Sequence, residues 1–111
     1  MDVPVEPLTL AGTMDDLARR GFTEQFKLSG GRLRGLNSGR AFGAEQLVVT
    51  EYYRFEGVSD PDDMAILYAI ETRTGLRGTL ADAFGAYADP GVSDFMDDVA
   101  IVSAMPLRRP A

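Results

Sequence analysis

One segment of the 111-residue chain combines positive charge with glycine. Between Glu24 and Glu45 it contains no acidic residue. Backbone N–H groups freed at a glycine turn and a nearby guanidinium are what a phosphate group requires. The segment lacks the GxxxxGK[ST] spacing of a P-loop, and its paired glycines equally predict a hairpin turn with solvated basic side chains. The candidate anion site comprises Lys27, Ser29, Gly30, Gly31, Arg32, Arg34 and Arg40.

An acidic segment follows further along the chain, where Asp60, Asp62 and Asp63 place three carboxylates within four residues. This density could hold Mg²⁺ together with a bound phosphate. It is not an EF-hand loop, because the required glycine and the distal Glu are missing. The residue types favour a turn in which Asp60 caps its own backbone and Pro61 fixes the chain. We therefore expect no cofactor unless this segment meets the basic one, in which case Mg²⁺ is the expected ion.

Tyrosines and carboxylates between residues 53 and 89 form a third group of candidates. Their hydroxyls could converge on a pocket, although tyrosines more often lie in a core with the hydroxyl at its rim. The chain contains neither His nor Cys, which excludes a Ser-His-Asp triad, a thiol nucleophile and the common zinc sites. Without a neighbouring His or Lys the group forms no complete acid–base pair, so we expect no catalytic residues. The pocket candidates are Tyr53, Tyr68, Asp82, Tyr87 and Asp89.

The charge distribution bears on the partners. The net charge is −6: residues 1–55 carry seven basic and seven acidic side chains, and residues 56–111 carry four and ten. Such a surface repels phosphate backbones and anionic lipid, so neither nucleic acid nor a membrane is an expected partner. The acidic, proline-containing N-terminus does not resemble a signal peptide, and the apolar runs are too short to cross a bilayer. A cytoplasmic protein is expected.

The elements that position these groups follow from the pattern of apolar residues. Residues 1–12 predict an extended lead-in, and Thr13 then caps a short helix that ends at Gly21, with Phe22 folding back onto Leu17. Alternation predicts a hairpin at residues 26–36 and strands at 47–56, 64–72 and 76–83. Residues 41–46 are either a loop or one helical turn.

Two of these strands carry specific expectations. In the first, Leu47, Val49, Tyr53 and Phe55 should share one face of a central strand. Residues 64–72 are apolar on both faces, which predicts a strand that is covered on both sides or lies at a dimer contact. A final helix, capped by Asp89 or Ser93, should bury Val92, Phe95, Met96 and Val99. The tail from residue 103 is expected to be disordered.

A family resemblance rests on the middle third of the chain. It is carried by Tyr53-Arg54-Phe55-Glu56-Gly57, Asp60-Pro61-Asp62-Asp63, Ile66-Leu67-Tyr68-Ala69-Ile70, Gly75, Gly78 and residues 82–89. These segments resemble a family of short uncharacterised bacterial proteins of about this length, often labelled phosphoribosylpyrophosphate synthetase by automated transfer. The synthetase itself is much longer and uses a histidine and a lysine-bearing loop that this chain lacks. The resemblance therefore implies family membership and a coherent fold, but it does not imply an activity.

Together the patterns predict one α+β domain over residues 1–111, with an antiparallel meander of four or five strands and both helices packed on one face. The other face would be partly apolar, which favours a non-enzymatic binding or protein-interaction module, or a homodimer formed through that face. The alternative is a protein that binds phosphate or sugar-phosphate ligands, or a small Mg²⁺-dependent enzyme.

Overall fold

The structure is a computed structural model, and it describes residues 10–55, 65–83 and 89–102. Within these residues the chain is α+β, as expected, with two helices, seven strands and one 3₁₀ turn. The elements are α1 (Leu10–Arg19), β1 (Glu24–Ser29), β2 (Arg32–Gly35), β3 (Ala41–Phe42), η1 (Ala44–Gln46), β4 (Leu47–Phe55), β5 (Ala65–Thr72), β6 (Arg77–Ala83), α2 (Pro90–Asp97) and β7 (Ala100–Ile101). Most of the expected lead-in and the expected tail lie outside the described residues, and α1 begins at Leu10, earlier than expected.

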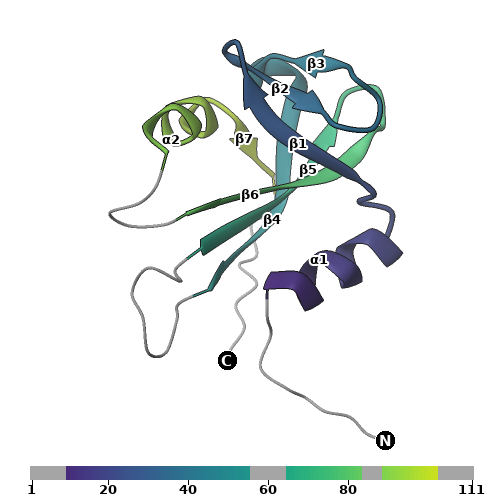
Figure 1. Ribbon diagram of the computed structural model, residues 1–111. Coiled ribbons are helices and arrows are strands. Elements are labelled where there is room, and N and C mark those ends of the chain that lie inside the picture. Colours follow the sequence, from purple (N-terminus) through teal and green to yellow (C-terminus); the bar gives the residue numbers. More distant parts are fainter. Residues whose placement is uncertain (1–9, 56–64, 84–88, 103–111) are drawn as a thin grey trace, which may run out of the picture.

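The strands form one curled sheet in the order β3-β2-β1-β6-β5-β4-β7 (Figure 1). The antiparallel run from β4 through β5 to β6 agrees with the expected meander. The prediction of a wholly antiparallel sheet of four or five strands is wrong, because β1 pairs with β6 in parallel and the short β7 pairs with β4 in parallel. Non-local pairings of this kind leave no local pattern in the sequence. The result is a mixed sheet of seven strands.

A glycine allows the β1–β6 pairing. Gly78 lies opposite Glu24 in the register, and a Cβ atom there would lie 2.3 Å from the Glu24 carbonyl oxygen. No side chain other than hydrogen fits this approach, so Gly78 is a packing requirement of the sheet.

The two helices lie on opposite faces of the sheet (Figure 1), which corrects the expectation that both pack on one face. Leu17 of α1 packs with Leu67 and Ala69 of β5, whereas Met96 of α2 packs with Ile70 of the same strand. Side chains alternate between the faces of a strand, so odd and even positions of β5 serve different helices. Both faces of β5 are thus covered within the chain, which accounts for its two-sided apolarity without a dimer contact.

A β-bulge in β4 overturns the expectation that Leu47, Val49, Tyr53 and Phe55 share a face. Val49 pairs with Ile70 and Glu51 pairs with Ala69, so Thr50 is the extra residue. An extra residue shifts every later side chain to the other face. Leu47 and Val49 accordingly lie in the core between the sheet and α2, and Tyr53 and Phe55 pack against the core between the sheet and α1.

Two helix ends form as expected, whereas the cap expected at Thr13 is wrong, because Thr13 lies inside α1. Gly21 has a φ of +103°, and Phe22 N–H donates to the Leu17 carbonyl over 2.9 Å, which is the Schellman end that the sequence predicts. At α2, Asp89 is the N-cap and accepts a hydrogen bond from Gly91 N–H at 2.8 Å. Neither described helix is long and apolar enough to cross a membrane.

Candidate functional site

The basic segment forms an exposed cationic surface on the β1–β2 hairpin. Lys27 and Arg34 are register partners on adjacent strands, and Ser29 pairs with Arg32 two positions further along. All four side chains are exposed. Among the residues that the structure describes, neither Lys27 nor Arg32 forms an ion pair. The hairpin therefore concentrates positive charge on one side of an otherwise acidic protein.

The two glycines of this segment serve the turn. Gly30 and Gly31 have φ values of +61° and +79°, which are the two positive values that a type I′ hairpin turn requires. Arg34 donates from Nη1 to the Gly39 carbonyl at 2.8 Å, and the Arg40 guanidinium lies 5.7 Å from the centre of the Phe42 ring. The structural alternative for the glycines is thus correct, while the exposed cations remain free to meet an anion.

Beneath this surface lies a buried carboxylate. Glu24 is 2% exposed, and its carboxylate accepts N–H hydrogen bonds from Gln25, Asn37 and Ser38 at 2.8 to 2.9 Å. Burial is the largest single influence and raises its pKa, but the hydrogen bonds together outweigh it, so the pKa of Glu24 lies below its ordinary value. The group anchors the loop after β2 and is not accessible to a ligand.

The acidic segment and the tyrosine group have separate outcomes. Asp60, Asp62, Asp63 and Tyr87 lie outside the described residues, so their role stays a prediction. Within the described part of the chain, no three Asp or Glu residues group closely enough to hold a metal ion. Tyr53 and Tyr68 do not converge, because the bulge places Tyr53 on the α1 face while Tyr68 packs against the α2 core. Asp82 influences Tyr68 electrostatically, and Asp89 caps α2.

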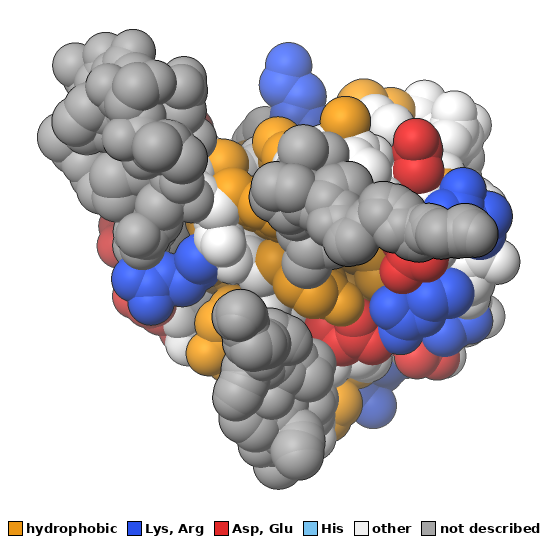
Figure 2. Space-filling model, turned by 90° about the horizontal axis from the view of Figure 1, so that it is seen from below, with side chains coloured by type: hydrophobic (Ala, Val, Ile, Leu, Met, Phe, Trp, Pro, Cys, Tyr) orange, Lys and Arg blue, Asp and Glu red, His pale blue; other side chains and the backbone are white. Residues whose placement is uncertain are grey.

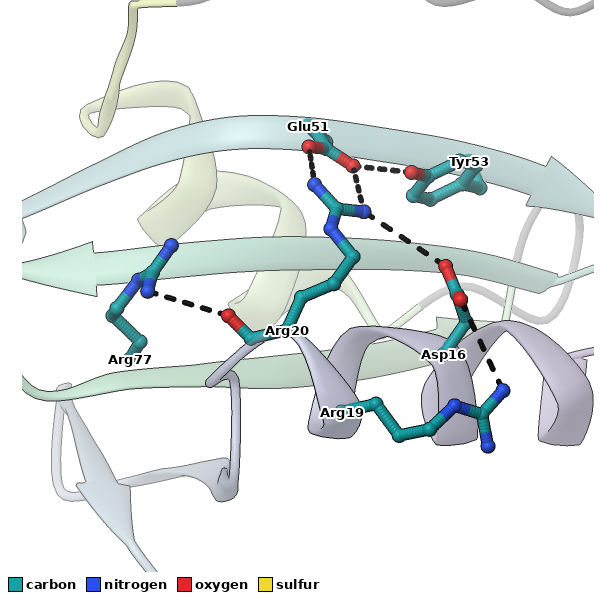
Figure 3. Close-up of polar contacts among 6 residues, drawn as sticks. All are labelled: Asp16, Arg19, Arg20, Glu51, Tyr53 and Arg77. Carbon is teal, nitrogen blue, oxygen red and sulfur yellow. Dashed lines mark hydrogen bonds and ion pairs between the residues drawn. The ribbon is translucent and has the colours of Figure 1, made fainter.

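A polar cluster that the sequence did not indicate joins α1 to the sheet (Figure 3). Arg20 donates from Nη1 to Glu51 Oε1 at 3.1 Å and from Nη2 to Glu51 Oε2, and the Tyr53 hydroxyl also donates to Oε1. The hydrogen bond from Arg20 is the main reason that the pKa of Glu51 lies below its ordinary value. Asp16 lies 3.9 Å from both Arg20 and Arg19.

The same cluster extends to β6. The Arg77 guanidinium lies 4.3 Å from the centre of the Phe22 ring, and its Nη1 atom donates to the Arg20 carbonyl at 3.3 Å. The Glu51 carboxylate already accepts from Arg20 and Tyr53, so it has little capacity left for a substrate. We interpret this cluster as the structural link between α1 and the sheet.

An open pocket lies on the opposite face, between α2 and the sheet. Its volume is about 250 Å³. Tyr52 and Tyr68 are register partners on β4 and β5, so their side chains lie on the same face of the sheet, and both line the pocket. Tyr52 is 45% exposed. The lining residues are Val49, Tyr52, Ile66, Tyr68, Ser93, Met96, Asp97 and Ile101.

The electrostatic environment of this pocket is acidic. Burial raises the pKa of Tyr68, and the charges of Asp82 and Asp97 raise it further. Among the described lining residues Asp97 is charged, and none is basic. The phenol of Tyr68 is therefore neutral at physiological pH and offers a ring and a hydroxyl to an occupant.

The sequence named Tyr68 for a pocket but did not indicate Ser93 and Asp97, which also line it. The sequence did not show on which face of the sheet Tyr52 lies, because the bulge in β4 determines that face. The helical period of α2 does place Ser93 and Asp97 one turn apart, which is a usable signal only once the helix is known to border the sheet here.

Figure 2 shows a further face of the molecule, on which hydrophobic side chains gather beside Asp, Glu, Lys and Arg side chains.

Comparisons with models of protein families, with curated proteins and with solved structures found no match for this chain. The resemblance to short bacterial proteins stays a prediction, and the pocket and the hairpin surface have to be interpreted from their own chemistry.

Proposed function

We propose that this protein is a non-enzymatic binding module whose ligand occupies the pocket between α2 and the sheet. The observation that carries the proposal is the pocket of about 250 Å³, which is lined by two tyrosines of neighbouring strands, by several apolar side chains and by only a few polar groups. Mostly apolar concave sites with a small number of polar groups are typical of ligand binding. The volume suits a small ligand or a single side chain of a partner.

The chemistry of the lining favours binding over catalysis. The pKa of Tyr68 is raised by burial and by nearby acids, so the phenol does not supply a base or a nucleophile near neutral pH. Asp97 is exposed and lines the pocket. These groups suit the recognition of a ligand.

Exposed apolar residues beside the pocket support a protein partner as one form of this function. Ile101 is 56% exposed and lines the pocket, and its neighbour Val102 is 58% exposed. A second copy of the chain would be one such partner. The net charge of −6 disfavours nucleic acid as a partner, and the proposal keeps the expected cytoplasmic location.

A blocked pocket tests the proposal. A thermal-shift screen of metabolites should find compounds that raise the Tm of the wild type and not that of Ser93→Trp, whose indole would fill the mouth. Ser93 is exposed on α2, so the fold should tolerate the change. Ser29→Trp is the matched control, because the same substitution then sits at an exposed serine of the β1–β2 hairpin that does not line the pocket. Stabilisation that persists in Ser93→Trp would contradict this site.

A second candidate function, binding of phosphate or sugar phosphate, is favoured by the cationic hairpin surface. Lys27 and Arg34 face each other across adjacent strands with exposed side chains. Two neighbouring cations can share one phosphate group. The Mg²⁺-dependent version of this function requires Asp60, Asp62 and Asp63, which lie outside the described residues.

A further inference from the structure

The walls of the α2 pocket restrict what can occupy it. Tyr52 and Tyr68 present two rings from neighbouring strands, and the buried Val49 and Met96 form an apolar part of the lining. Ring faces carry negative electrostatic potential, whereas ring edges carry positive potential. An apolar occupant gains binding free energy from contact with these ring faces. A positive charge on the occupant adds a cation–π attraction.

Among the described residues, the charged groups that line the pocket or act on its Tyr68 hydroxyl are acidic. Asp97 lines the pocket, and both Asp82 and Asp97 act on the Tyr68 hydroxyl. No described lining residue is basic; Arg54 lies two positions beyond Tyr52 on β4 but does not line the pocket. An anion would meet like charge there, and a neutral apolar ligand would leave Asp97 without a counterion. A cation satisfies both the carboxylate and the rings.

We propose that the pocket between α2 and the sheet binds a small organic ammonium ion, held by the rings of Tyr52 and Tyr68 and by the Asp97 carboxylate. This inference rests on the proposed binding function and names the ligand class for the same pocket. It differs from the hairpin surface, which would take an anion.

An isosteric series of three probes tests the charge requirement. Choline, 3,3-dimethylbutan-1-ol and 3,3-dimethylbutanoate share a branched head and differ in charge, being positive, neutral and negative. Each is titrated into the full chain while amide shifts are followed by NMR. Choline should bind about tenfold more tightly than the alcohol, and the anion should bind most weakly. The shifted amides should include those of Tyr68, Ser93 and Asp97.

Two variants test which residues produce the preference for choline over the neutral alcohol. Asp97→Asn should reduce the advantage of choline over the alcohol from about tenfold to about threefold, because the carboxylate contribution is lost. Tyr68→Leu should reduce it similarly, because a ring face is lost. The control is Asp15→Asn, which makes the same change of charge at an exposed residue of α1 on the opposite face and should leave the advantage unchanged. Since Asp97 is exposed, its substitution tests the inference even where Tyr68→Leu fails to fold.

The source of the ammonium group is distinguished by a further titration. Nα-acetyl-lysine N-methylamide presents the same charge at the end of a protein side chain. Binding tighter than that of choline would assign the pocket to a lysine of a partner protein, and weaker binding would assign it to a free small ligand. Either result supports the ammonium class.

The outcomes separate this inference from the function on which it rests. If all three isosteres bind the pocket with equal affinity, or if the alcohol or the carboxylate binds best, the pocket is a ligand site but not one for ammonium ions. If no probe shifts the pocket amides and the metabolite screen also finds no compound blocked by Ser93→Trp, the binding function itself is overturned.

Discussion

Arg20 and Glu51 lie thirty-one residues apart in the sequence and form a bidentate ion pair that links the end of α1 to β4 (Figure 3). The Glu51 side chain is 18% exposed and the Arg20 side chain 43%, so the pair is partly shielded from water. The Tyr53 hydroxyl donates to the same carboxylate. The bulge at Thr50 makes this possible, because it turns Glu51 and Tyr53 toward α1.

Removal of this pair should loosen α1. Arg20→Ala should lower the free energy of unfolding by about 1–2 kcal/mol, because it leaves a partly buried carboxylate without its cation. Urea denaturation measures the change. Arg19→Ala is the matched control, because the Arg19 side chain is 73% exposed and its ion pair with Asp16 is long, at 3.9 Å. This variant should lower the free energy of unfolding by less than about 0.5 kcal/mol. Equal losses of unfolding free energy in the two variants would show that the Arg20–Glu51 ion pair does not stabilise the fold.

Glu24 should make stability depend on pH. Its pKa is lower in the folded than in the unfolded chain, so its contribution is complete above the ordinary carboxyl pKa and is lost as pH falls toward the folded value. Glu24→Gln should cost about 2 kcal/mol at pH 7, because an amide cannot replace a carboxylate that accepts three N–H groups.

Denaturation curves at neutral and acidic pH measure this effect. The difference between wild type and Glu24→Gln should shrink as the pH falls below the ordinary carboxyl pKa of about 4.3. Asp94→Asn, at an exposed position of α2, controls for the change in net charge. A difference that stays constant across this pH range would rule out the charged form as the source of stability.

Gly78 should not tolerate a side chain. Gly78→Ala would bring a Cβ atom to 2.3 Å from the Glu24 carbonyl oxygen, and relief of this clash requires β1 to move away from β6. We expect a loss of about 3 kcal/mol, measured by thermal or urea unfolding. Gly91→Ala, in the first turn of α2, meets its nearest atoms at 3.3 Å and should change stability by less than about 0.5 kcal/mol. A neutral Gly78→Ala variant would contradict the parallel β1–β6 pairing.

The hairpin surface predicts anion binding that depends on salt. Inorganic pyrophosphate should bind measurably by calorimetry at low ionic strength and more weakly at physiological ionic strength, because exposed charges are screened. The double variant Lys27→Gln, Arg34→Gln should reduce the affinity at least about tenfold, since it removes both register partners. Arg19→Gln combined with Arg73→Gln makes the same charge change at exposed positions away from the hairpin. If both double variants weaken binding equally, only net charge is involved.

The sequence by itself determined the features that depend on neighbouring residues. The Schellman end at Gly21, the Gly30-Gly31 turn, the Asp89 cap and the alternating strands all rest on hydrogen bonds and side-chain periods within a few residues. The absence of His and Cys likewise limited the chemistry before any fold was known. These features therefore follow from residue types and spacing alone.

The tertiary structure alone decided how distant segments meet. The parallel pairings of β1 with β6 and of β4 with β7 depend on backbone groups far apart in the chain, which no local period records. The bulge at Thr50 separates Tyr53 from Tyr68 and brings Tyr52 beside Tyr68 in the pocket. A single extra residue in a strand reverses every side chain after it, and only the pairing with the next strand shows where that residue is.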